Sequence, residues 1–176
     1  MKLSSIAIIP GLLGMANAVN MSKYSPQKGV DAGFQAYLKE LYASAEDTAA
    51  TTAFTNFFTS TGQLIVLTNT ATGAEEILAL KQKLLPPGGP KHWNHFPNVT
   101  SVDSETTAQK IYKVLGVIET TYDGGNCSSA YYSSRFTVTK NTAGAVQLTT
   151  HAGTLAKYDD FVVDPDTSPT PIECTS

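Results

Sequence analysis

The sequence carries little charge and no basic cluster. Lys and Arg number 12 and Asp and Glu 15 among 176 residues, so charged residues make up 15% and the net charge is −3. Binding to nucleic acid depends on Lys and Arg that neutralise phosphates, so this composition argues against a nucleic-acid partner. The hydrophobic share of 41% is that of a folded domain rather than of a disordered tail.

Common catalytic and cofactor signatures are also missing. The sequence has no Gly-x-Ser-x-Gly elbow, no phosphate-binding loop and no dinucleotide fingerprint. Its three histidines lack metal-ligand spacing. The acids Asp159, Asp160, Asp164 and Asp166 have no further carboxylate at a calcium-loop spacing, and we interpret them as solvated turn residues. We therefore expect neither a metal nor a cofactor.

No apolar run is long enough for a membrane span. The apolar stretch Leu3–Met15 is shorter than the roughly 20 residues that a bilayer requires. It follows a basic start and precedes Ala16-Asn17-Ala18, which has the form of a cleavage site. Residues 1–18 are therefore predicted to be a signal peptide. We expect a protein that is secreted or lies in the lumen of the secretory pathway, without a membrane contact after cleavage.

Only two cysteines are present, Cys127 and Cys174. In a secreted chain such a pair predicts a disulfide. The bond would close a loop of about 48 residues, which the chain-entropy model values at about 4 kcal/mol. It would tie the Pro-rich tail, residues 165–176, to the loop Asp123–Asn126. Two free thiols, or a cysteine nucleophile, are the alternatives.

Three sequons accompany the predicted signal peptide. They begin at Asn20, Asn98 and Asn126. Together they predict a glycoprotein of the eukaryotic secretory route.

The first half of the chain has helical periodicity. Phe34, Tyr37, Leu38, Leu41 and Tyr42 form one apolar stripe. This stripe predicts a helix over Asp31–Glu46, in which Asp31 acts as a cap rather than as a base. We expect a second helix from Asp47 to Ser60-Thr61-Gly62, a short strand over Gln63–Thr68, and a third helix over Ala74–Leu85.

The second half is rich in Val, Ile, Thr, Tyr and Phe, as is typical of antiparallel strands. The predicted strands are Trp93–Asp103, Ala108–Tyr122, Ala130–Lys140 and Val146–Val163, the last of them with a bulge or bend at His151-Ala152-Gly153. After a polar lead-in over 19–30, the sequence therefore predicts one α+β domain over 31–164. Its helices would lie on one face of a mostly antiparallel sheet.

The order of these elements resembles the nuclear transport factor 2-like cone fold and its SnoaL-like branch. The helix Phe34–Tyr42, the segment Phe54–Leu64, the turn Gly73–Ile77 and the pair His95-Phe96 carry the resemblance. The runs Trp93–Thr100 and Ala130–Phe136 are similar to those of secreted filamentous-fungal proteins with a SnoaL-like domain.

This resemblance implies three helices that close one side of a strongly curved mixed sheet, with an apolar pocket inside. It also implies a pocket that holds a small hydrophobic ligand and moves a proton without a cofactor. Scytalone dehydratase, a member of the family, carries a catalytic histidine followed by Phe at the corresponding strand start, to which His95-Phe96 is similar. The second catalytic histidine of that enzyme has no counterpart in Ala108–Tyr122, which favours a binding protein.

Strand parity points His95 toward the interior. A glycosylated Asn98 must face solvent, and in a regular strand His92 shares its face while Trp93 and His95 take the other. A bulge at Pro97 would invert this parity. Histidine can exchange a proton near neutral pH, so we predict a catalytic role for His95. The alternative is a core histidine bound to a backbone carbonyl.

The remaining candidates are aromatic or distant in sequence. Tyr37 and Tyr42 lie on the apolar stripe of the first helix, where they either polarise a substrate carbonyl or only fill the core. Trp93, Phe58 and His151 are predicted to contact the ligand; for Trp93, a place in the core is the alternative. In particular, His151 could take the place of the missing second histidine.

Three functions fit these features. The first is a secreted, cofactor-free dehydratase, cyclase or isomerase that acts on a small hydrophobic, polyketide-like metabolite. The second is a non-catalytic binding or effector protein with the same pocket. The third is a structural homodimer whose pocket is filled by side chains.

Overall fold

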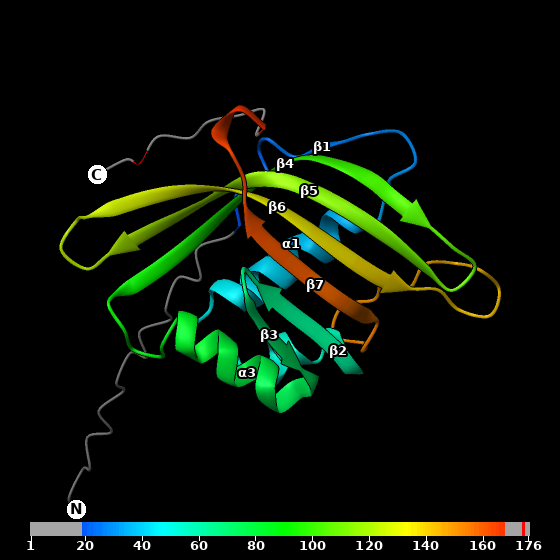
Figure 1. Cartoon of the computed structure of the whole chain (residues 1–176), viewed down its shortest axis with the longest axis horizontal. Helices are drawn as coiled ribbons and strands as arrows, with labels where there is room; N and C mark the ends of the chain where they lie inside the picture. The colour runs from blue at the N-terminus through cyan, green and yellow to red at the C-terminus, as the bar shows by residue number, and fades with distance from the viewer. Residues whose placement is uncertain (1–18, 168–173, 175–176) are drawn as a thin grey trace, which may run out of the picture.

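The computed structural model describes residues 19–167 and Cys174 (Figure 1). The predicted signal peptide, residues 1–18, and most of the Pro-rich tail lie outside the described residues. Within the described part of the chain, no helix is both long enough and apolar enough to cross a membrane.

A single mixed sheet forms the body of the protein. Its strand order is β1-β4-β5-β6-β7-β2-β3. The pairs β1–β4 and β2–β7 are parallel and the others are antiparallel. The strands are β1 Ser25–Pro26, β2 Phe58–Val66, β3 Asn69–Thr72, β4 Lys91–Glu105, β5 Gln109–Tyr122, β6 Cys127–Thr139 and β7 Leu155–Val162.

Three α-helices accompany the sheet: α1 Phe34–Glu46, α2 Thr52–Thr55 and α3 Gly73–Leu84. A 3₁₀ turn, Pro165–Thr167, follows β7. The long strands β4 to β6 arch over α1, while α3 packs against β2 and β3 (Figure 1). The predicted class, three helices on a strongly curved and mostly antiparallel mixed sheet, is therefore confirmed.

The apolar face of α1 fills the concave side of the sheet. The five residues of its predicted stripe are at most 1% exposed, as the periodicity required. Phe34 stacks on Tyr112 of β5 with ring centroids 3.8 Å apart and meets Phe136 of β6 edge-on at 6.0 Å. Burial of these large side chains is the main force that holds α1 under the sheet.

The predicted role of Asp31 as a helix cap is wrong. The N-cap is Gly33, and no side chain caps the helix. Instead, one carboxylate oxygen of Asp31 accepts hydrogen bonds from Lys110 Nζ at 2.5 Å and from the Tyr112 hydroxyl at 2.6 Å. Burial opposes ionisation of Asp31, but these two donors outweigh it and lower the pKa of the carboxyl. The residue thus ties the start of the domain to β5.

The predicted second helix, Asp47–Gly62, is only one short helix that gives way to a strand. Only Thr52–Thr55 is helical, and β2 already begins at Phe58. A Cβ on Gly62 would lie 2.9 Å from the Leu155 carbonyl oxygen, so this segment passes very close to β7. Sheet pairing therefore overrides the apparent helical spacing of the phenylalanines.

The last predicted strand is too long at its start. Val146 forms only an isolated bridge with Lys140, and the regular strand begins at Leu155. Between them, His151 and Gly153 take positive φ angles of 56° and 66°. The bend was therefore placed correctly, but it separates β7 from a non-strand segment.

The sequence placed Asn98 in solvent, and this is wrong. The register of β4 against β5 shifts between Pro97 and Thr100. Asn98 is only 6% exposed, and its Nδ2 has no hydrogen-bond partner. A glycan on Asn98 would have to displace this side chain from its buried position. Asn20 and Asn126 are exposed, and glycosylation there stays a prediction.

Cys127 and Cys174 are joined in a disulfide, with Cα atoms 6.0 Å apart. The prediction of a bridge is confirmed, and the alternatives with free thiols are excluded. The bond connects the first residue of β6 to the tail.

Candidate active site

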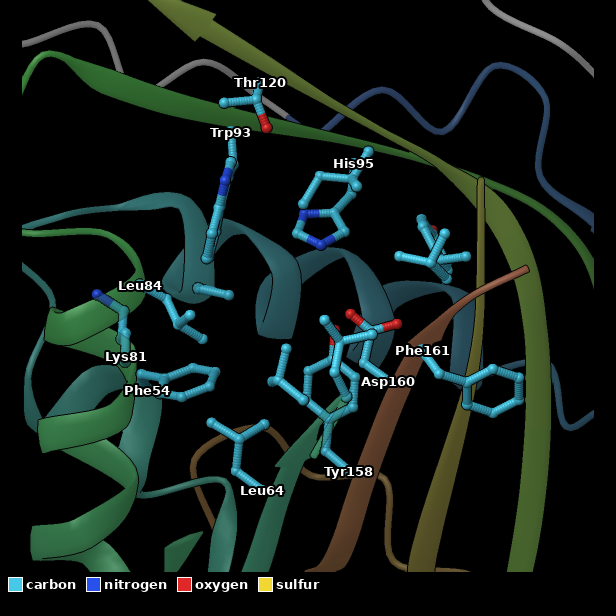
Figure 2. Close-up of a pocket in the computed structure, with 16 residues that line it drawn as sticks. Phe54, Leu64, Lys81, Leu84, Trp93, His95, Thr120, Tyr158, Asp160 and Phe161 are labelled. Atoms are coloured by element: carbon cyan, nitrogen blue, oxygen red, sulfur yellow. The ribbon is translucent and has the colours of Figure 1, made fainter. Parts of the chain in front are cut away.

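A cavity of about 190 Å³ lies between the long strands and the layer formed by α2, α3 and β2. Most of its wall is apolar, and its lining includes Phe54, Leu64, Leu84, Trp93, Ile118 and Tyr158. Figure 2 shows Trp93 and His95 extending from β4 on one side, with Phe54 and Leu64 on the other. Such a mainly apolar cup with few polar groups is typical of a small-molecule site.

His95 is one of the polar residues in this wall and is only 3% exposed. Its Nδ1 lies 2.9 Å from Glu46 Oε1, and its backbone N–H donates to the same oxygen at 2.6 Å. With Nδ1–H donating to Glu46, the other ring nitrogen, Nε2, is the one left to act in the cavity. Nε2 has no hydrogen bond within the described residues.

Tyr42 fixes the plane of the same ring. The phenol of Tyr42 stacks on the imidazole with centroids 4.1 Å apart and planes inclined by 8°. Glu46 and Tyr42 are one helical turn apart on α1, so both hold His95 from the same helix. Tyr42 therefore lies behind the histidine, and its predicted contact with a substrate is not what the geometry provides.

Asp160 of β7 is the second functional group of the cavity. Its interpretation as a solvated turn acid is wrong, because it lies in a strand and lines the pocket. Ser134 donates a hydrogen bond from Oγ to Asp160 Oδ1 at 2.6 Å. Figure 2 shows the carboxyl group and the imidazole of His95 facing the same space.

The surroundings of Asp160 favour its neutral form. Burial raises the pKa of the carboxyl, and this effect outweighs the opposing influence of the Ser134 hydroxyl and of His95. A carboxylic acid that keeps its proton to higher pH can donate it to a substrate oxygen.

The raised pKa of Asp160 predicts a pH-dependent stability. Because the folded state binds this proton more tightly than the unfolded chain, the free energy of unfolding falls as pH rises above the ordinary pKa, 3.8, toward the folded value. Asp160→Asn is expected to remove this loss, so the variant gains stability relative to the wild type between pH 4 and 7. Urea unfolding at both pH values measures the difference. An equal difference at the two pH values would contradict the assignment.

Two phenols complete the polar side of the site. Tyr132 and Tyr158 line the cavity, and burial raises the pKa of both hydroxyls well above the ordinary value. The hydroxyls of Tyr42 and Tyr132 lie close enough to influence each other, yet neither makes a well-formed hydrogen bond. A buried phenol without a partner is costly, so both rings are held in place by packing rather than by their hydroxyls.

Lys81 contributes its stem rather than its charge. Its Nζ donates to the carbonyl oxygens of Asp47 at 2.7 Å and Ala50 at 3.2 Å, and Figure 2 shows the nitrogen pointing away from His95 and Asp160. Burial lowers the pKa of the ammonium. Lys81 therefore stabilises the connection between α1 and α2.

Three other predicted residues do not reach the cavity. His151 lies in the turn before β7, with Nδ1 2.7 Å from the Ala53 carbonyl oxygen, so it does not replace a second catalytic histidine. Phe58 packs edge-on against Phe54 from behind the wall. Tyr37 is buried among Phe34 and Phe57.

Two predictions on placement are confirmed. Trp93 is partly buried and lines the cavity. His92 lies at the surface, where its Nε2 is 2.9 Å from Asp123 Oδ1.

The described residues offer one group of metal-ligand type, Glu119 with Cys127 and Cys174. Both sulfurs are bonded to each other, which leaves a single carboxylate. This group therefore lacks the ligands of a zinc site.

Comparison with known proteins gives structural matches only. No family model and no curated protein matches the sequence. ActVI-ORFA from Streptomyces coelicolor superposes with a TM-score of 0.55 at 10% identity, over 77% of this chain and 99% of that one. A ketosteroid isomerase-like protein from Erwinia carotovora atroseptica gives 0.52 at 17% identity, over 76% and 93%.

A third match is to a larger protein. The Orange Carotenoid Protein from Anabaena, in a structure binding canthaxanthin, superposes with a TM-score of 0.57 at 14% identity, over 94% of this chain and 45% of that one. The protein therefore has the nuclear transport factor 2-like cone fold, as the order of elements predicted. The narrower likeness to fungal proteins stays a prediction.

Proposed function

We propose that the protein is a cofactor-free enzyme of dehydratase, cyclase or isomerase type that acts on a small hydrophobic metabolite in the secretory route. One observation carries the proposal: an oriented imidazole and a carboxyl with a raised pKa face the same apolar cavity. Dehydration, aldol-type cyclisation and double-bond isomerisation share one step, the removal of a proton next to a carbonyl. This pair of groups suits that step.

The two groups take complementary roles. His95 Nε2 accepts the proton from carbon, while Asp160 donates its proton to the carbonyl oxygen on which negative charge develops. Glu46 is a positioning residue, because it holds Nδ1 and stabilises the imidazolium that forms. The apolar wall excludes water, which strengthens these interactions.

The structural matches support the proposal at the level of class. One match is named a ketosteroid isomerase-like protein. A polyketide-like substrate follows only from the sequence resemblance to SnoaL-like proteins.

Deuterium exchange tests the shared proton step without knowledge of the natural substrate. The protein is incubated in D₂O with 2-tetralone, a bicyclic ketone with acidic protons next to its carbonyl, and deuterium uptake is followed by mass spectrometry. We expect exchange above the buffer rate, and a lower rate for Asp160→Asn. Exchange at the buffer rate for 2-tetralone and for single-ring aryl ketones would reject the enzyme.

The second candidate is a non-catalytic binding protein. The predominantly apolar wall and the match to a carotenoid-binding protein favour it. It predicts saturable quenching of Trp93, the only tryptophan of the chain, by a ketone that undergoes no exchange. The third candidate required a pocket filled by side chains, and the open cavity contradicts it. Whether the protein forms a homodimer stays a prediction.

A further inference from the structure

Two exposed apolar side chains lie at the mouth of the cavity. Within the described residues the exposed large hydrophobic side chains are Leu67, Tyr122 and Val162, at 58%, 41% and 58% exposure. Leu67 and Val162 both line the cavity, whereas Tyr122 does not. We call these two residues the apolar rim. Exposed apolar groups that adjoin a pocket often mark where a ligand lies.

Leu67 holds its place at a conformational cost. It lies in the turn between β2 and β3 with φ of 55°, a value that suits Gly or Asn and that is unfavourable for leucine. Its backbone N–H donates to the Asp160 carbonyl oxygen at 3.0 Å. Core packing does not offset this cost, because Leu67 is 58% exposed. A contact between its side chain and a ligand would offset it.

The apolar rim lies next to the polar end of the cavity. Asp160 and Val162 are two residues apart on β7, so their side chains leave the same face of the strand about 7 Å apart. On the neighbouring strand, Val66 pairs with Asp160, and Leu67 follows it. A ligand whose oxygen lies at His95 and Asp160 thus has the rim beside its opposite end.

The volume of the cavity limits how much of a ligand it can enclose. About 190 Å³ is little more than the roughly 150 Å³ that encloses benzene. It is less than the roughly 300 Å³ at which ordinary ligand pockets begin. The enclosed part accommodates one or two rings, and the rest of a larger ligand must pass over the mouth.

We propose that the ligand is an elongated amphiphile. Its oxygen-bearing ring enters the cavity, and its hydrocarbon chain leaves across the rim formed by Leu67 and Val162. This inference rests on the proposed function only for the location of the polar end. The rim then selects ligands by the length of their apolar chain.

Calorimetric titration of the full chain with phenol, 4-butylphenol and 4-octylphenol tests the selection. We expect the affinity of the wild type to rise roughly twofold or more per added methylene up to the butyl group. The double variant Leu67→Asn, Val162→Thr replaces the rim with polar side chains of similar size. It should bind 4-butylphenol about tenfold more weakly and phenol within about twofold of the wild type.

Matched variants guard against trivial explanations. Tyr122→Ser removes an exposed apolar side chain outside the cavity and should leave all three affinities unchanged. Val162→Thr alone should give part of the loss, and it keeps the test available if the double variant unfolds. Affinity independent of chain length, or an equal loss for phenol and 4-butylphenol, would overturn the proposal.

The two proposals can fail separately. If affinity depends on the length of the alkyl chain but no deuterium is exchanged, the elongated ligand is supported and the enzymatic function is rejected. If 2-tetralone exchanges deuterium but affinity does not depend on chain length, the elongated ligand is rejected and the enzymatic function is retained.

Discussion

Replacing His95 with glutamine is expected to lower the rate of deuterium exchange by about 10²- to 10⁴-fold, the usual contribution of a general base. Glutamine keeps the approximate size and hydrogen-bonding capacity of histidine but cannot carry a proton between substrate and solvent. The measurement is the initial rate of exchange of 2-tetralone, compared with that of His92→Gln. His92 is exposed and does not line the cavity, so its variant should keep the full rate.

The fold should survive the substitution, and this separates catalysis from stability. Glu46 loses the bond to Nδ1, but the backbone N–H of residue 95 still donates to the same oxygen. A glutamine amide can also donate to Glu46 from its side chain. We therefore expect a modest change in the urea midpoint. A variant that unfolds like the wild type and still exchanges deuterium at the wild-type rate would exclude the role of His95.

The inward direction of His95 could be predicted from the sequence, but one premise of that prediction was wrong. Parity along β4 pointed Trp93 and His95 inward, and both line the cavity. A solvent-facing Asn98 was the premise of this parity, yet Asn98 is buried and lies within the register shift between Pro97 and Thr100. The bulge that the sequence flagged at Pro97 lies after His95, so the inward direction of His95 survives although the premise does not.

The partners of His95 come from places that local patterns do not connect. Glu46 ends α1, and its distance from His95 along the chain is 49 residues. No periodic signal on α1 distinguishes it from a solvated acid. Asp160 did carry a signal, since Tyr158, Asp160 and Val162 are every second residue and therefore share one face of β7. Reading the acidic pair Asp159-Asp160 as a turn concealed that alternation.

Helices with a continuous apolar stripe were predictable, whereas the segment after α1 was not. Along the thirteen residues of α1 the apolar stripe keeps the helical repeat. The local preference for a helix and the burial of one face therefore agree. Around Phe54 to Phe58 the spacing suits a helix locally, but the pairing of β2 with β3 and β7 is formed by residues far away in the chain. Tertiary contacts decide such short segments.

Among the glycines that the structure describes, Gly116 is the one whose replacement by alanine is expected to cause the largest loss of stability. A Cβ at Gly116 would lie 2.5 Å from the Tyr132 hydroxyl oxygen and 2.6 Å from the Phe96 carbonyl oxygen. The second atom belongs to the backbone of the paired strand β4, so it cannot rotate away. We expect the free energy of unfolding to fall by about 1–3 kcal/mol, as is usual for overpacking, measured by urea denaturation.

Gly33→Ala is the matched control, because its Cβ would meet only Leu148 at an ordinary 3.5 Å. If both variants lose the same stability, the close contact at Gly116 is not the cause.

The same contact links stability to the site. Gly116 leaves the room in which the Tyr132 phenol lies against β5 and reaches the cavity wall. An added methyl group must displace this ring, which lines the cavity, so Gly116→Ala should also weaken phenol binding, whereas Gly33→Ala should not.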